Sequence, residues 1–158
     1  MSITTDIVES WRRPRVVVRR HLARGRSEPF AFSLLVAFLV LAFVAQWPAA
    51  SRAAFADGNT PVAPRLLAIG LALLATIPLW YGLAAVGRLV ARALGGRGSW
   101  YGARIALFWS LVAVTPLMLL QGLVAGMIGP GPALTAVGVI AGLVFVIFWA
   151  QALIEVER

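Results

Sequence analysis

The residues of this chain that could do chemistry gather between positions 87 and 109. Four arginines and five glycines lie in this segment: Arg88, Arg92, Arg97, Arg104, Gly87, Gly95, Gly96, Gly98 and Gly102. The segment has no acid, cysteine or histidine, so it offers positive charge without a carboxylate or imidazole base or a thiol nucleophile. The run from Gly95 to Gly98 also lacks the lysine-plus-hydroxyl pair with which a nucleotide-binding loop ends. We therefore expect a helix cap and a turn whose arginines contact lipid phosphates or a partner protein.

Other reactive residue types are scarce along the whole chain. There is one histidine, His21, and no cysteine, which excludes disulfides, thiolate catalysis and cysteine metal sites. A lone histidine without a neighbouring acid or cysteine in sequence favours an interfacial polar group over a metal ligand. The sequence thus predicts no catalytic residue, no metal site and no cofactor, and it predicts that the protein is not an enzyme.

Composition places the chain in a membrane. Of its 158 residues, 61% are hydrophobic and only 13% are charged, whereas a soluble domain is about half apolar and a quarter charged. The formal net charge is +8, and all 14 basic residues are arginines. Because these arginines flank apolar runs, we expect contact with anionic lipid headgroups and no nucleic-acid partner. The absence of lysine is typical of a GC-rich bacterial genome, so we predict the bacterial inner membrane.

Four apolar runs predict an all-α membrane protein, a polytopic bundle of four, possibly five, transmembrane helices. A helix of ~20 residues crosses the hydrocarbon core of a bilayer. The runs cover residues 30–47, 66–86, 105–128 and 133–154, within one transmembrane domain at 29–155. None of them contains an ionisable residue, so no proton pathway is expected inside the membrane. Residues 49–64 are predicted to form a loop.

Residues 1–28 form a basic segment that we expect to be cytoplasmic. Pro14 is suited to begin a helix and Gly25 to end it. In that helix Val17, Val18 and His21 fall on one side and the arginines mostly on the other, which predicts an amphipathic helix in the headgroup plane. A solvated basic tail is the alternative. Arginines predicted to contact lipid headgroups or a partner are Arg12, Arg13, Arg19, Arg20, Arg88, Arg92, Arg97 and Arg104.

Prolines and glycines predict how the spans bend and pack. Pro78 and Pro116 lie inside apolar runs and predict kinks, because proline removes a helical hydrogen bond and clashes with the preceding turn. Residues 129–132, Gly-Pro-Gly-Pro, predict a tight hairpin between the last two spans. Each of these spans has a G-x-x-x-G spacing that permits close backbone approach in lipid. We therefore expect the pair Gly122 and Gly126 to pack against the pair Gly138 and Gly142.

Orientation follows from counting arginines. With four spans, the N-terminal segment, the turn between the second and third spans and the C-terminal residue lie on one side and hold 12 arginines. The other side holds Arg52 and Arg65. Because positive residues stay inside, both termini are predicted to be cytoplasmic.

The chain resembles the small bacterial members of the Yip1 family. The resemblance rests on the basic segment from Trp11 to Arg15, on LGGRGSW and YGARIALFW at 94–109, and on Thr115-Pro116 in the following span. It implies a polytopic, non-catalytic membrane protein; eukaryotic members bind small GTPases and act in vesicle traffic. We count four apolar segments where the family is usually drawn with five. The sequence also lacks the long acidic N-terminal domain of eukaryotic members, on which a GTPase partner would depend.

Three functional hypotheses follow. The first is a membrane-organising or adaptor factor that acts through helix packing and basic cytoplasmic contacts, with a membrane-protein partner or as a homo-oligomer. The second is an accessory subunit of a larger bacterial membrane complex, respiratory or photosynthetic. The third is a small transporter or channel, in which Tyr81, Trp109 and Gln121 line a cavity between the kinks.

Overall fold

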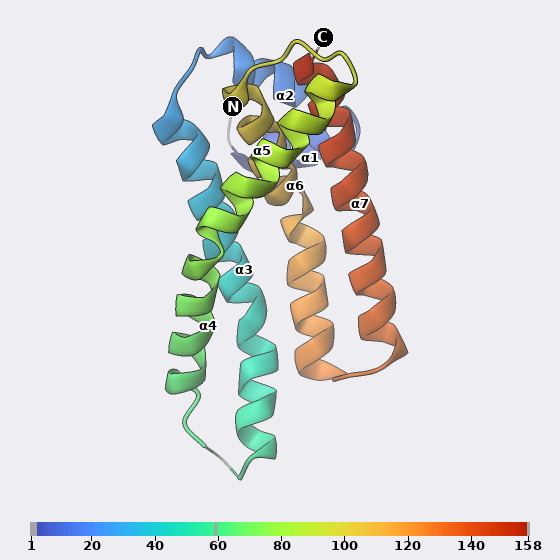
Figure 1. Ribbon diagram of the computed structural model, residues 1–158. Coiled ribbons are helices and arrows are strands. Elements are labelled where there is room, and N and C mark those ends of the chain that lie inside the picture. Colours follow the sequence, from blue (N-terminus) through green and yellow to red (C-terminus); the bar gives the residue numbers. More distant parts are fainter. Residues whose placement is uncertain (1–2, 59, 158) are drawn as a thin grey trace.

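The protein is helical throughout the part that the structure describes. The computed structural model describes residues 3–58 and 60–157, and these contain seven helices and no strand (Figure 1). The helices are α1 (Ile3–Ser10), α2 (Pro14–Ala23), α3 (Glu28–Ala56), α4 (Ala63–Ala75), α5 (Ile77–Ala93), α6 (Trp100–Met127) and α7 (Pro132–Glu157).

Four stretches of helix are long and apolar enough to cross a membrane. They are α3 with 29 residues, α4 and α5 together with 31, α6 with 28 and α7 with 26. At 1.5 Å per residue each exceeds the ~30 Å of a hydrocarbon core. Figure 1 shows α1, the end of α7 and the turn between α5 and α6 at one end, which we call the basic end. The connections from α3 to α4 and from α6 to α7 lie at the opposite, far end. The prediction of a four-span all-α bundle is confirmed; Arg158, counted with the basic end, lies outside the described residues.

Local sequence explains where the helices begin and end. Pro14 is the first residue of α2, where its missing N–H costs nothing. The hydroxyls of Ser27 and Ser99 cap α3 and α6 by accepting from the backbone N–H of Phe30 at 3.4 Å and of Gly102 at 2.9 Å. Gly95 ends α5 at φ +91°, a left-handed conformation that suits glycine alone among common residues.

The predicted loop at residues 49–64 is wrong over its first half, because α3 continues through Pro48 to Ala56. Ala50 and Ala54 are buried, so this extension is held by packing. Arg52 adds hydrogen bonds from its guanidinium to the carbonyls of Gly126 and Met127, both at 3.2 Å. These carbonyls lie in the last turn of α6, where no N–H of the helix itself is available to donate a hydrogen bond to them. The tertiary contacts thus outweigh the helix-breaking tendency of Pro48.

The second span is interrupted two residues before Pro78. Thr76 separates α4 from α5, and its hydroxyl donates to the carbonyl of Leu73 at 2.6 Å while accepting from Trp80 Nε1 at 3.0 Å. Pro78 favours a break in the helix at this point, and the Thr76 hydroxyl stabilises the break by these two hydrogen bonds. Pro116, in contrast, lies inside α6, which is one uninterrupted helix from Trp100 to Met127.

The G-x-x-x-G motif of α6 packs against α3. The prediction that it packs against the G-x-x-x-G motif of α7 is therefore wrong. A methyl group at Gly122 would lie 2.7 Å from the carbonyl carbon of Ala45, and one at Gly126 would lie 2.8 Å from that of Pro48. Of the two glycines on α7, Gly138 faces the amide of Gln121 and Gly142 faces open space. The error arises because a helix with small residues on one face does not specify which neighbour uses that face.

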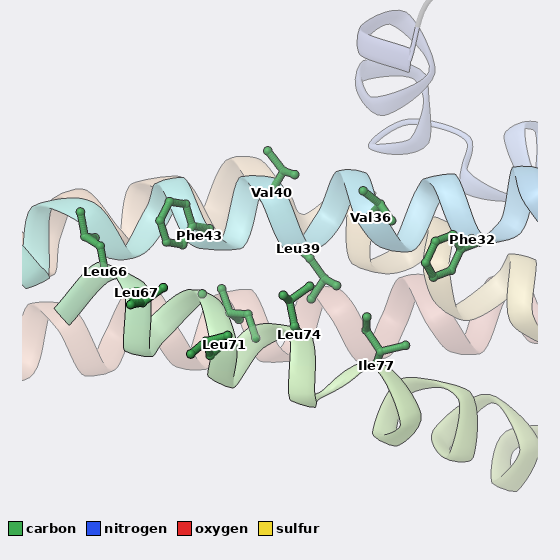
Figure 2. A pocket seen from close by; sticks show the side chains of 12 residues that line it. Phe32, Val36, Leu39, Val40, Phe43, Leu66, Leu67, Leu71, Leu74 and Ile77 are labelled. Atoms are coloured by element: carbon green, nitrogen blue, oxygen red, sulfur yellow. The ribbon is translucent and has the colours of Figure 1, made fainter. Parts of the chain in front are cut away.

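The buried core lies toward the basic end. Between Tyr101 and Thr115 every residue of α6 except Arg104 is buried, because α1, α2, α3, α5 and α7 all contact this helix. By comparison, α4 buries only Leu66. Beside α4, an apolar groove of about 430 Å³ runs along α3, lined by leucines of α4 and by residues such as Val36 and Phe43 (Figure 2). Its wholly apolar lining matches the hydrocarbon of a bilayer.

Candidate functional site at the basic end

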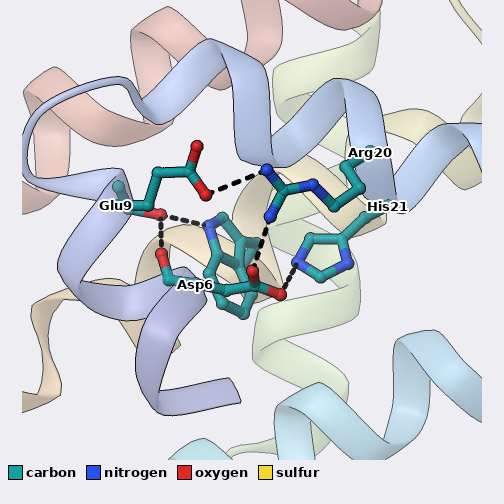
Figure 3. Close-up of polar contacts among 6 residues, drawn as sticks. Asp6, Glu9, Arg20 and His21 are labelled. Carbon is teal, nitrogen blue, oxygen red and sulfur yellow. Dashed lines mark hydrogen bonds and ion pairs between the residues drawn. The ribbon is translucent and has the colours of Figure 1, made fainter. Parts of the chain in front are cut away.

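The two short N-terminal helices form a folded cap. We call α1 and α2, residues 3–23, the N-terminal cap. Arg20 on α2 donates to the carboxylates of Asp6 at 2.7 Å and Glu9 at 2.9 Å on α1, as Figure 3 shows. Asp6 is only 1% exposed, so its charge is kept in the protein interior by the paired guanidinium. Hydrogen bonds to these carboxylates raise the pKa of Arg20, which keeps the pair charged.

His21 lies inside the molecule, which corrects its predicted place at the membrane interface. It is 1% exposed and packs between Trp109 and Phe30, with ring centroids 4.4 Å and 5.4 Å away. Neither ring nitrogen has a hydrogen-bond partner among the described residues; Nε2 is 3.9 Å from Asp6 Oδ2 (Figure 3). Burial, and secondarily the charge of Arg24, lowers the pKa of His21 to about 4. At neutral pH it is an uncharged core residue.

The N-terminal cap is attached to the membrane bundle by specific polar contacts. Trp109 Nε1 on α6 donates to Ser10 Oγ at 2.9 Å, and Trp11 Nε1 donates to the carbonyl of Ala113 at 3.2 Å. On α7, Glu155 accepts from Arg19 Nε at 2.8 Å. Together with the buried Val17 and Val18, these contacts fix the orientation of the N-terminal cap relative to α6 and α7. The segment is therefore not a solvated tail: α2 is amphipathic as expected, and its buried side packs on protein.

The glycine-rich segment encloses an acid that sequence reasoning missed. We call residues 94–99, between α5 and α6, the glycine turn. Glu157 at the end of α7 accepts from the backbone N–H of Gly98 at 2.8 Å and from Arg88 Nη1 at 2.9 Å. A methyl group at Gly96 would lie 2.9 Å from the carboxyl carbon of Glu157, and one at Gly98 would lie 2.7 Å from its Oε1. The glycines therefore leave space for this carboxylate, and Arg88 is only 8% exposed.

Half of the arginines predicted to contact lipid or a partner have acidic partners within the chain. Arg19 pairs with Glu155, Arg20 with Asp6 and Glu9, Arg88 with Glu157, and Arg104 with Glu28. The other four, Arg12, Arg13, Arg92 and Arg97, are exposed and have no ion pair with any described residue. Each of the chain's six acids, in fact, has an arginine partner. The arginine excess is what leaves the basic end positively charged.

The arrangement brings together charges and packing surfaces rather than reactive groups. Over residues 3–58 and 60–157, no group of three or more histidines and acids is placed to hold a metal ion. The three residues that sequence reasoning placed around a transport cavity lie in different surroundings. Trp109 is buried against His21, Tyr81 packs on Phe108 with ring centroids 5.2 Å apart, and Gln121 faces Gly138.

Four long apolar helices and a folded, arginine-rich end define a multi-pass helical membrane protein. The model of the Yip1 domain matches residues 8–157, nearly the whole chain, so the protein belongs to the Yip1 family. This match covers the end of α1 and all of α2 as well as the membrane helices. No curated protein and no solved structure matches the chain.

Proposed function

We propose that this protein is a non-catalytic organising or adaptor factor of the bacterial inner membrane, with its basic end in the cytoplasm. The observation that carries the proposal is the N-terminal cap, which is fixed on α6 by a buried and a partly buried hydrogen bond and on α7 by the ion pair between Arg19 and Glu155. A segment that served only to attract anionic lipid would not need such a fixed structure. A folded cap offers one defined surface to a partner.

The exposed face of the N-terminal cap has the composition of a binding surface. Val8 is 65% exposed and Trp11 is 43% exposed, and both are close in sequence to the unpaired Arg12 and Arg13. Tryptophan and arginine are enriched at protein interfaces, because one side chain supplies both a large contact area and a polar group. This surface suits an acidic segment of a membrane-protein partner at the headgroup level.

Orientation is supported by the distribution of unpaired charge. At the far end, Arg65 pairs with Asp57 and Arg52 binds the end of α6. The unpaired Arg12, Arg13, Arg92 and Arg97 are all at the basic end. The positive-inside bias therefore supports cytoplasmic termini.

An accessory-subunit role is the second candidate, favoured by the apolar faces of α4 and α7. Leu67 and Leu71 on α4 are 66% and 59% exposed, and Leu143 on α7 is 59% exposed. In an accessory subunit, helices of the larger complex would cover such faces in place of lipid.

Copurification in mild detergent tests the proposal. The protein is isolated from its native membranes after chemical cross-linking, as wild type, as R12E/R13E and as R92E/R97E. We expect a stoichiometric partner that is lost from R12E/R13E and retained by R92E/R97E, which makes the same charge reversal outside the cap. A partner carrying prosthetic groups would instead favour the accessory subunit. Isolation of the protein alone, with no cross-linked partner, would count against the adaptor role.

A further inference from the structure

A second groove opens at the basic end between the last turns of α5 and α7. It measures about 400 Å³ and has apolar walls from Val90 on α5, from Leu94 at the start of the glycine turn, and from Leu153 and Ile154 on α7. Leu94 is 84% exposed, Val90 54% and Ile154 48%. The groove exists because α5 ends in the glycine turn, where Gly95 and Gly96 supply no side chains to close it.

Charge around this groove is positive. The one acid that lines it, Glu157, is already neutralised by Arg88 at 2.9 Å. Two arginines adjacent in sequence to lining residues, Arg92 beside Ala91 and Arg97 beside Gly96, are exposed and have no acidic partner within residues 3–58 and 60–157. Two unpaired arginines are thus next in sequence to residues that line the apolar groove.

We propose that this groove binds one anionic phospholipid, with an acyl chain between α5 and α7 and the phosphate at Arg92 and Arg97. The assignment rests on the proposed function in one respect, the placement of the basic end at the cytoplasmic leaflet, where anionic lipids are exposed. The complementarity is chemical: the walls match hydrocarbon, and guanidinium groups bind phosphate oxygens through two parallel hydrogen bonds. The groove along α3 and α4 has apolar walls but no charged lining residue, so it could hold an acyl chain without a site for the phosphate.

Native mass spectrometry of the full chain tests the site. The protein is purified with 1-palmitoyl-2-oleoyl phosphatidylglycerol or with the zwitterionic phosphatidylcholine of the same chains. We expect wild type to retain one phosphatidylglycerol preferentially. R92Q/R97Q should weaken retention by about fivefold for each arginine, the effect of one basic residue at an anionic surface. R13Q/R15Q removes the same charge from the N-terminal cap and should retain the lipid.

A second pair of variants tests the acyl-chain position without changing charge. Ala150→Phe places a ring in the groove, which Ala150 lines, whereas Val146→Phe places one on the exposed face of α7 a turn away. We expect only Ala150→Phe to lose the lipid. Unchanged retention in both R92Q/R97Q and Ala150→Phe would overturn the site, as would equal retention of the two lipids by wild type. Neither result bears on the partner lost from R12E/R13E, so the two proposals fail separately.

Discussion

Substitution of one glycine tests how α3 and α6 approach each other. In Gly122→Ala the new methyl would lie 2.7 Å from the carbonyl carbon of Ala45, whereas ordinary contact begins near 3.4 Å. Both groups are helix backbone or fixed to it, so no side chain can rotate away. The carbonyl oxygen of Ala45 lies closer still, so the helices must separate locally by at least about 0.7 Å. A gap of that size removes about a quarter to a half of the dispersion energy of each contact it opens.

This separation sets the expected loss of stability. Overpacking of a close interface costs about 1–3 kcal/mol. For a chain of this length each kcal/mol corresponds to roughly 2–4 °C, so the unfolding midpoint in detergent should fall by several degrees. Gly142→Ala is the matched control, because its methyl meets nothing within 4 Å and alanine is the better helix former. Its midpoint should stay constant or rise.

The measurement is thermal unfolding in one detergent, followed by near-ultraviolet circular dichroism and by the onset of aggregation. A neutral Gly122→Ala would refute the close approach of α3 and α6. Equal destabilisation by both substitutions would show that Gly142 is also packed, and that the two G-x-x-x-G motifs act together as sequence reasoning expected.

Three further predictions concern a buried ion pair, the protonation of His21 and the membrane topology. Glu157→Ala leaves Arg88 buried without a partner and should lower the free energy of unfolding by about 3–5 kcal/mol, whereas Asp57→Ala, in an exposed pair, should cost at most about 1 kcal/mol; equal losses would contradict the burial of Arg88. The pKa of His21, about 4 when folded against 6.5 ordinarily, means that its stabilising effect is complete above pH 6.5 and is lost as pH falls toward 4. Unfolding midpoints between pH 6.5 and 5 should thus fall less in His21→Asn than in wild type, and identical slopes would exclude this role. Reporter fusions after Gly58 and after Gly98 should report opposite compartments; the same compartment for both would contradict the four-span topology.

The membrane spans could be predicted from sequence because hydrophobicity alone determines them. Runs of ~20 apolar residues leave few structural alternatives in a bilayer. Prolines and glycines at positions such as Pro14 and Gly95 also gave correct helix starts and ends, since their backbone preferences are local. The continuation of α3 past Pro48 was not predictable in this way, because it depends on contacts with the end of α6.

The candidate site was harder to predict, since its contacts join distant parts of the chain. Glu157 is 59 residues from Gly98, which it contacts, and nothing in the local pattern of the glycine turn indicates an acid there. His21 looked interfacial because its helix is amphipathic, but the apolar side of α2 covers protein, not lipid. The composition contained a useful signal. Because the chain has 14 arginines and only six acids, an arginine partner could be expected for each acid.

The N-terminal cap has a consequence for the order in which the protein is assembled. Its binding surfaces belong to α6 and α7, and Arg19 is 136 residues away from Glu155. During synthesis, residues 3–23 leave the ribosome long before either helix has been made, so they cannot take their final place at that stage. Only insertion of the last span supplies Glu155. The docked cap therefore marks a completed molecule, and a chain stalled after α5 would leave Trp11, Val17 and Val18 uncovered for quality-control proteases to recognise.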